Sequence, residues 1–277
     1  MWETSISLNP LAVYVVAIDL MYGLSKQSWS KQVELIESGL LVVLQTPEYN
    51  VIIYTSHQTT DLTTGLCVQI LYQAVNCMAT RNPGFYQSTN FATLRNRPIA
   101  RLLITDLDHW DFPPIGTSNS SIHSIETRSY DLVNSLEATE TTSPTSTPTA
   151  DSGELTDPDD NLFKIRYQYS GQRVLNGDVF SAAIDGLAMA AQYDSDGPCD
   201  SITALSISRK VVWHIGRSTT HPTFTSELTR VFFLMIRDLF LKERRFQELW
   251  FHLEYEGEIV ADGYVIKWNE KPGIANE

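Results

Sequence analysis

Two aspartates are the first candidates for acid–base chemistry. Asp19 and Asp185 each lie in the middle of an otherwise apolar stretch of helical character. A carboxylate on an apolar helix must find hydrogen-bond partners or hold its proton more tightly, and two such groups brought together can share a proton. The alternative is that each carboxylate accepts hydrogen bonds and fixes its helix in place, which is the commoner role of a buried polar group.

An acidic segment could hold a metal ion, and its possible ligands are Asp106, Asp108, His109 and Asp111. Carboxylates suit Mg²⁺ or Ca²⁺, and the imidazole would admit Zn²⁺ or Fe²⁺. The segment lacks the glycine and the distal glutamate of a calcium loop, and it leads into two prolines, which is typical of a turn. We therefore expect no metal site, and the lack of phosphate- and dinucleotide-binding motifs in the sequence predicts no cofactor.

The cysteines and histidines do not form a catalytic set by their spacing. Cys67, Cys77 and Cys199 show no C-x-x-C pattern and no adjacent basic residue, which suits free thiols in a reducing compartment. His57 and His214 are expected near strand ends, where a histidine is more often a structural donor than a base. The common hydrolase and metalloprotease motifs are also missing from the sequence.

A polar segment divides the chain. Residues 137–160 are almost wholly Ser, Thr, Pro, Asp and Glu, a composition that cannot bury enough apolar surface to offset the entropy of ordering. We interpret residues 111–160 as a largely disordered linker between a first unit, residues 1–110, and a second unit, residues 161–277. The net charge of the chain is −13, and residues 131–160 carry 8 acidic and no basic side chains.

The two units repeat each other. The segment around Asp19 corresponds to the segment around Asp185. Further along the chain, one constant difference in residue number pairs the apolar stripe of a second helix in the first unit with the stripe of a helix in the second unit. The same difference still pairs residues beyond that helix. The paired segments are Val13–Asp19 with Val179–Asp185, Cys67–Ala79 with Leu228–Phe240, and Phe85 with Phe246. We call the offset that pairs Phe85 with Phe246 the repeat offset. Such self-similarity predicts an internal duplication.

Each unit is expected to be α+β, with the order β-α-β-β-α-β-β. Alternating apolar residues predict strands, and helical periodicity predicts two helices on one face of an antiparallel sheet. In the first unit the strands are expected at 2–8, 39–45, 50–57, 85–94 and 99–105, and the helices at 10–25 and about 61–80. In the second unit the strands are expected at 163–169, 202–208, 211–217, 248–255 and 259–267, and the helices at 177–193 and about 226–245. Two such units would most simply pack about a pseudo-two-fold axis.

The first helix of each unit is apolar nearly all round, which indicates burial on two sides. We expect these helices to lie at the seam between the units. Apolar side chains there could line a site for a hydrophobic small molecule or a partner segment. The candidate ligand-binding residues are Tyr14, Met21, Phe180 and Met189.

Composition excludes several classes of partner. The chain has 33 acidic and 20 basic residues, which argues against nucleic acid or an anionic membrane surface. The apolar runs Leu11–Ile18 and Val231–Ile236 end at charged residues and are far shorter than the ~20 residues needed to span a bilayer. Because no secretory signal is convincing, a cytoplasmic protein is expected.

The segment Arg245–Phe251, followed by Ala261–Tyr264, together with the Val179–Ala191 helix and the Ser/Thr/Pro spacer, resembles uncharacterised proteins of filamentous fungi. The resemblance implies no activity, and suggests an accessory protein in fungal specialised metabolism. The sequence thus favours a non-catalytic accessory or binding protein. The alternative is an acid–base enzyme, such as a cyclase, isomerase or hydrolase, that uses Asp19 or Asp185.

Overall fold

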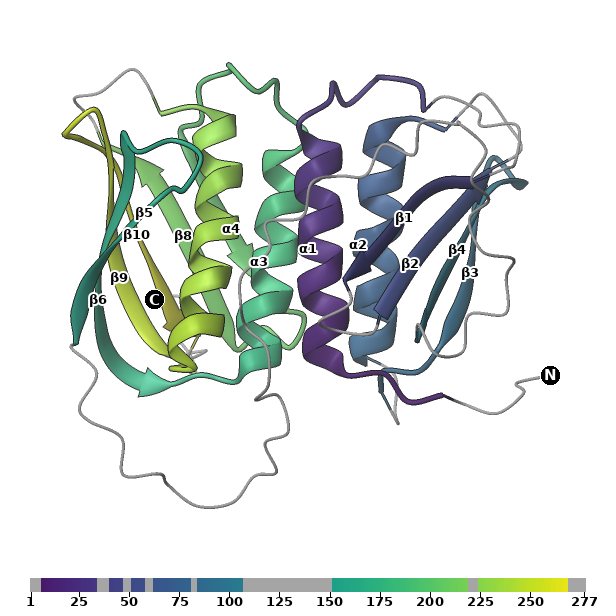
Figure 1. The fold of residues 1–277 in the computed structure, drawn as a ribbon, viewed down its shortest axis with the longest axis horizontal. Coiled ribbons are helices and arrows are strands. Elements are labelled where there is room, and N and C mark those ends of the chain that lie inside the picture. The colour runs from purple at the N-terminus through teal and green to yellow at the C-terminus, as the bar shows by residue number, and fades with distance from the viewer. Residues whose placement is uncertain are drawn as a thin grey trace, which may run out of the picture. The chain divides into compact units, whose positions relative to one another are not determined.

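A computed structural model describes residues 6–33, 40–46, 51–57, 62–80, 84–106, 151–218 and 224–268. The chain forms two compact units, residues 1–150 and residues 151–277 (Figure 1). Both units are α+β, and each combines an antiparallel sheet with two helices, so this part of the predicted fold class is confirmed.

The first unit has a four-stranded antiparallel sheet in the order β1-β2-β4-β3. Its described elements are α1 (Pro10–Ser25), β1 (Leu40–Thr46), β2 (Val51–His57), α2 (Thr64–Thr80), β3 (Ser88–Leu94) and β4 (Arg97–Asp106). The two helices pack against each other, and α1 also contacts β1 and β2. An isolated bridge joins Ser7 to Tyr86 beside β3, and backbone hydrogen bonds of Ile6 and Leu8 flank it; residues 2–5 of the strand expected at 2–8 lie outside the described residues.

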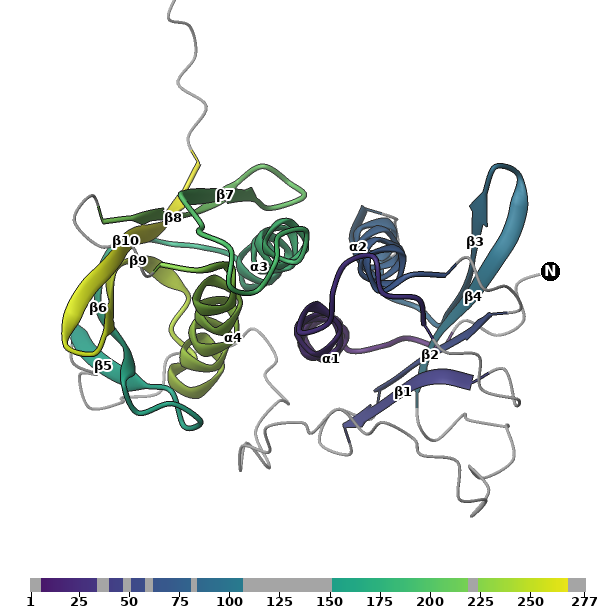
Figure 2. The ribbon, with the colours of Figure 1, turned by 90° about the horizontal axis from the view of Figure 1, so that it is seen from above.

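The second unit has a six-stranded antiparallel sheet in the order β5-β6-β9-β10-β8-β7. Its elements are β5 (Ser152–Thr156), β6 (Phe163–Arg173), α3 (Asn176–Ala190), β7 (Ser201–Leu205), β8 (Val211–Arg217), α4 (Ser226–Glu243), β9 (Gln247–Tyr255) and β10 (Glu258–Lys267). The helices α3 and α4 cover one face of this sheet (Figure 2).

Local sequence sets the ends of these elements. Asn9 caps α1 by accepting hydrogen bonds from the amides of Leu11 and Ala12, with Pro10 in the first turn, and Thr225 caps α4 in the same way through Leu228. Such caps satisfy amides that have no partner within the helix.

An aromatic cluster forms the core between α4 and the sheet. Trp213 of β8 stacks on Phe233 of α4 with ring centroids 5.5 Å apart and contacts Phe232 and Phe240 of the same helix. Phe251 of β9 packs against Phe232 at 4.5 Å. All five rings are buried, so the inward positions of β8 and β9 and one stripe of α4 meet in one apolar layer.

The strand β5 departs from the expectation of a linker up to residue 160. Its polar composition gave no strand signal, but its backbone pairs with β6 over Ser152–Thr156. Gly153 leaves room for the Tyr167 hydroxyl, since a Cβ there would lie 2.4 Å from that oxygen. Glu154 is paired with Lys164 at 3.0 Å and Arg166 at 3.2 Å. Residues 111–150 of the predicted linker lie outside the described residues.

Candidate functional site

Asp185 serves as a structural acceptor in the second unit. One of its carboxylate oxygens accepts a hydrogen bond from the amide of Leu205 at 3.0 Å, which ties α3 to the edge strand β7. Asp185 and Asp19 are both half-buried, and Asp19 also has an interaction partner. This contact gives Asp185 the hydrogen-bonding role that its sequence context offered as the alternative to catalysis.

The four predicted ligand-binding residues lie on the first helix of each unit. Tyr14, Met21 and Phe180 are buried, and Met189 is half-buried. Two of them contact aromatic rings of their own unit: Tyr14 meets Phe85 edge-on at 5.2 Å, and Phe180 meets Phe246 in the same manner at 5.9 Å. These contacts place both rings in the cores of their units. A seam site formed by these residues stays a prediction.

The predicted metal ligands fall mostly outside the described residues, which include Asp106 but not Asp108, His109 or Asp111. Among the residues that the structure describes, no group of three or more His, Cys, Asp or Glu side chains could hold a metal ion. The cysteines are free thiols in the structure. Burial raises the pKa of Cys67 to about 12, which disfavours the reactive thiolate.

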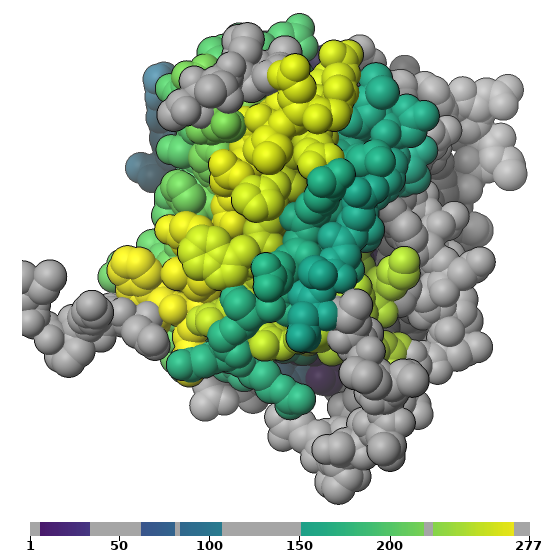
Figure 3. All heavy atoms as spheres, turned by 90° about the vertical axis from the view of Figure 1, so that its left-hand side faces the viewer, coloured from purple at the N-terminus to yellow at the C-terminus, as the bar shows by residue number. Residues whose placement is uncertain are grey.

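The open face of the second sheet carries a row of aromatic side chains. Because paired residues of neighbouring strands point to the same face, the register places five residues in line across β7, β8, β10, β9 and β6. These residues are Thr203, His214, Tyr264, Trp250 and Gln168. Figure 3 shows this face, with β9 and β10 in yellow and β5 and β6 in teal.

The rings of the row touch their neighbours. His214 stacks on Tyr264 with centroids 5.1 Å apart and an angle of 29° between planes, and Trp250 leans on Tyr264 at 5.1 Å and 56°. Thr203 fixes the imidazole through a 2.8 Å hydrogen bond between its hydroxyl and Nδ1 of His214. Trp250 is 52% exposed, so the row ends in an indole that is open to solvent.

Further apolar side chains extend this row. Leu205 is 39% exposed at the end of β7, and Trp268, which follows β10, is 46% exposed. Ile266 lies two residues beyond Tyr264 on the same face of β10 and is half-buried. Exposed apolar side chains that gather on one face of a sheet mark interaction sites. We call His214, Trp250, Tyr264, Ile266 and Trp268 the aromatic face.

A charged row runs beside the aromatic face, one step along the strands. It crosses β10, β9, β6 and β5 in register through Asp262, His252, Arg166 and Glu154. His252 pairs with Asp262, and Arg166 bridges Glu154 and Glu254, each at 3.2 Å. Lys164 and Arg166 hold the pKa of Glu154 below its usual range. Charges of both signs are matched here, so the row offers polar partners without a strong net field.

A second polar cluster lies at the end of α4, on the helix side of the sheet. The Tyr167 hydroxyl donates to Glu243 at 2.5 Å, and Arg245 stacks over the Tyr169 ring at 4.2 Å while its guanidinium binds Asp151 at 2.8 Å. Burial first, and then the Glu243 carboxylate, raise the pKa of both tyrosines. The cluster fastens β6 to the end of α4.

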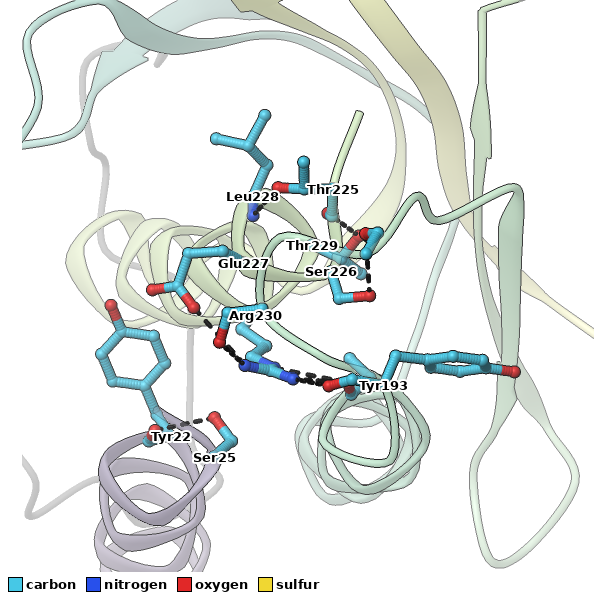
Figure 4. A network of polar contacts seen from close by, with 12 residues as sticks. Tyr22, Ser25, Tyr193, Thr225, Ser226, Glu227, Leu228, Thr229 and Arg230 are labelled. Atoms are coloured by element: carbon cyan, nitrogen blue, oxygen red, sulfur yellow. Dashed lines mark hydrogen bonds and ion pairs between the residues drawn. The ribbon is translucent and has the colours of Figure 1, made fainter. Parts of the chain in front are cut away.

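A buried arginine closes the other end of the helix pair. Arg230 is 1% exposed, and its guanidinium donates to the carbonyl of Ala190 at 3.1 Å and to that of Tyr193, as well as to Ser195 at 2.8 Å and Glu227 at 3.5 Å (Figure 4). Because the last carbonyls of a helix have no partner within it, a cation there satisfies them and the helix dipole together. The N–H donors of the Arg230 guanidinium are therefore engaged in hydrogen bonds that hold this end of the helix pair together.

Sequence reasoning missed the aromatic face, although a signal was present. Trp250 and Tyr264 occupy positions of β9 and β10 that alternate with the buried residues Leu249, Phe251 and Val265. In a strand with one solvated face, those positions are normally polar.

Comparison of the chain with protein-family models, with curated proteins and with solved structures found no match. Among the described residues, no helix is long and apolar enough to cross a membrane.

Proposed function

We propose that this protein is a non-catalytic binding protein and that the aromatic face of the second sheet holds its ligand. The observation that carries the proposal is the ladder of His214, Tyr264 and Trp250, which ends in an indole that is 52% exposed. Aromatic rings on a rigid sheet give a large contact area at a low entropic cost, because their side chains have few rotatable bonds.

The first unit provides an internal comparison. Its strands pair in the same relative order, and Thr89 faces Leu103 across β3 and β4 at the positions that the repeat offset assigns to Trp250 and Tyr264. The first sheet therefore forms without these rings. A feature that the fold does not require is better explained by a function of the second unit than by its stability.

The ligand that fits this surface is a hydrophobic small molecule or a partner with a planar apolar group. Such a group can stack against the indole of Trp250, and the polar side chains beside it, among them Gln168 and His252, can orient a ligand by hydrogen bonding. This assignment keeps the expected class of partner and moves the site from the helices to the sheet. An accessory role in fungal specialised metabolism rests on the sequence resemblance alone.

We also propose that the two units arose by internal duplication. The repeat offset pairs Arg97 with Glu258, which are the first residues of β4 and β10, and both strands have the same length. The hairpin before each of them turns on two residues with positive φ, Arg95-Asn96 and Glu256-Gly257, which correspond at the same offset and match the type I′ turn that suits a twisted hairpin. A pseudo-two-fold arrangement of the units remains a prediction from the sequence.

Acid–base catalysis is the weaker alternative. One carboxylate oxygen of Asp185 accepts a hydrogen bond from a backbone amide of β7, which favours an anchoring role. If the enzyme hypothesis holds instead, replacing Asp185 with Asn should abolish turnover while leaving the unfolding midpoint nearly unchanged. The binding hypothesis predicts the reverse, a loss of stability without any effect on ligand affinity.

The proposal can be tested with a planar apolar probe, 8-anilinonaphthalene-1-sulfonate, titrated into the full chain. Binding at the aromatic face should quench the indole fluorescence. Trp250→Ala and Tyr264→Ala should each weaken binding by about tenfold, as expected when one stacking contact of about 1–2 kcal/mol is lost.

Tyr193→Ala is the matched control, because Tyr193 is an exposed aromatic residue (58%) that follows α3 and is not part of the aromatic face. It should leave probe affinity unchanged. Equal affinities of the native chain, Trp250→Ala and Tyr264→Ala would rule out the aromatic face as the site.

A further inference from the structure

The aromatic face extends along β10 well beyond Trp250. The strand places Tyr264 and Ile266 on its open side, and Trp268 follows in the same alternation. The amide of Trp268 donates to the carbonyl of Lys210 at 2.7 Å, one residue beyond the last pair of the ladder between β10 and β8. Trp268 therefore continues the register of these two strands past the end of β10.

Two exposed indoles lie at the two ends of this surface. Trp250 is 52% exposed and Trp268 is 46% exposed, and Trp250 faces Tyr264 across β9 and β10. Because Trp268 lies four residues beyond Tyr264, the two ends are separated by about 13 Å along the strand, at ~3.3 Å per residue. A compact planar molecule covers one of these indoles but cannot reach both. A ligand that uses the whole aromatic face is therefore elongated.

The spacing along β10 matches that of an extended peptide. Side chains on one face of an extended chain repeat every second residue, or about every 6.6 Å. Tyr264, Ile266 and Trp268 have the same period, because they are alternate residues of one strand. Strands that pack face to face run within about 30° of each other. A peptide that lies along β10 can therefore place its side chains i, i+2 and i+4 over these three positions.

The charges differ between the two ends of the aromatic face. Lys210, opposite Trp268, is exposed, and none of the ion pairs among the described residues involves its ammonium group. Beside Trp250 the charges are matched, since His252 pairs with Asp262. An acidic side chain of the ligand is therefore favoured at the Trp268 end.

We propose that the aromatic face binds an extended peptide segment of a partner protein, with apolar side chains at i, i+2 and i+4 and an acidic residue beside the anchor at Trp268. The other outer anchor would stack on Trp250, and the middle side chain would contact Ile266. Two linked anchors bind more tightly than one, because the second contact forms at a high effective concentration. This inference rests on the proposed function and names the class of its partner.

The test uses the full chain and the fluorescein-labelled peptide Glu-Trp-Thr-Val-Thr-Trp-Glu, whose symmetric order of residues allows binding in either direction. One comparison peptide has a single Trp, the other being replaced by Thr. A second, Glu-Thr-Trp-Val-Trp-Thr-Glu, has the same composition but places its Trp residues at i and i+2. Fluorescence anisotropy should show that the i, i+4 peptide binds at least about tenfold more tightly than either comparison. Lys in place of both Glu residues should weaken its binding.

Variants of the protein test each end of the surface. Trp268→Ala should lower the affinity for the i, i+4 peptide to that of the single-Trp peptide, but should leave the affinity for 8-anilinonaphthalene-1-sulfonate unchanged. Lys210→Gln should weaken peptide binding about two- to fivefold, as expected for an exposed charge pair. Lys242→Gln is the matched control, because it removes the same charge from an exposed position near the end of α4. It should bind the peptide as the native chain does.

The outcomes separate this inference from the proposed function. If the anilinonaphthalene probe binds at Trp250 but all three peptides bind equally, or Trp268→Ala leaves peptide binding unchanged, the face takes a compact ligand and this inference is wrong. If Trp250→Ala affects neither the probe nor any peptide, the proposed function itself fails. Displacement of the probe by a linear oligosaccharide, but by none of the peptides, would assign the face to a glycan.

Discussion

At the scale of single residues, Arg230 is the side chain whose loss should cost most stability in the second unit. It is buried and donates hydrogen bonds to the carbonyls of Ala190 and Tyr193. Arg230→Met should lower the free energy of unfolding by about 3 kcal/mol, because the two carbonyls, Ser195 and Glu227 would all lose a charged donor. Urea denaturation measures this loss.

The exposed Arg166 provides the comparison for this prediction. It also makes ion pairs, with Glu154 and the buried Glu254, but the Arg166 side chain itself is 59% exposed. Arg166→Met should therefore cost less than about 1 kcal/mol. Similar losses in the two variants would contradict the structural role given to Arg230.

The tyrosines beside Glu243 make stability depend on alkaline pH. The pKa values of Tyr167 and Tyr169 are raised in the folded state by burial and by the carboxylate, above the value of ~10 expected in an unfolded chain. The stability linked to their protons is fully present below about pH 10 and is lost as the pH rises toward the folded pKa. The free energy of unfolding should therefore fall between about pH 10 and about pH 11.

Phe substitutions isolate this effect, since Phe does not titrate. Tyr167→Phe combined with Tyr169→Phe should lower stability at about pH 8, where a hydrogen bond to Glu243 is lost, but should flatten the decline above about pH 10. Tyr193→Phe, at an exposed ring, should leave the alkaline decline as it is in the native chain. An equally steep decline in the double variant would assign the alkaline loss to other groups.

At the scale of elements, the close approach of α3 and α4 depends on Gly186. A Cβ at this position would lie 2.1 Å from the ring of Phe233, a side chain that is completely buried. Alanine is the better helix former by about 1 kcal/mol, yet Gly186→Ala should destabilise the protein by about 1–2 kcal/mol, because overpacking outweighs propensity. Thermal unfolding of Gly186→Ala and of Gly186→Ala combined with Phe233→Leu tests this, since the smaller side chain should recover part of the loss.

The elements themselves were largely predictable from the sequence. The strand expected at 259–267 is β10, Glu258–Lys267, and the helix expected at 177–193 is α3, Asn176–Ala190. Strong periodicity and turn residues are local properties, so they could be read directly. β5 could not, because its strand conformation comes from pairing with β6 and from the space that Gly153 leaves for Tyr167.

The candidate site was less predictable, because it depends on register. Trp250, Tyr264 and His214 are far apart in the sequence, and only the pairing of β8, β10 and β9 brings them into one row. The repeat offset aligned His214 with Ile53. The structure instead gives His214 the place of Tyr54, since His214 faces Tyr264 and Tyr54 faces Leu103. A shift of one residue in a strand changes the face, so the offset alone was misleading.

At the scale of the whole molecule, two units of similar topology carry different surfaces. The second presents stacked rings on its open sheet face, and the first has exposed arginines and an exposed phenylalanine on the hairpin of β3 and β4. If the units arose by duplication, their outward side chains diverged while the scaffold was kept, because outward positions are under little constraint from the core. The overall charge of −13 would describe neither surface.

The central claim is that the aromatic face binds the ligand. The most direct test is nuclear magnetic resonance of the full chain with isotope-labelled tryptophan, tyrosine, histidine, methionine and phenylalanine, titrated with 8-anilinonaphthalene-1-sulfonate. The largest shift changes should fall on Trp250, Tyr264 and His214 and should saturate with one affinity. Saturating chemical-shift changes confined to Tyr14, Met21, Phe180 and Met189, with no changes on the aromatic face, would contradict this assignment. They would place the ligand at the first helix of each unit instead.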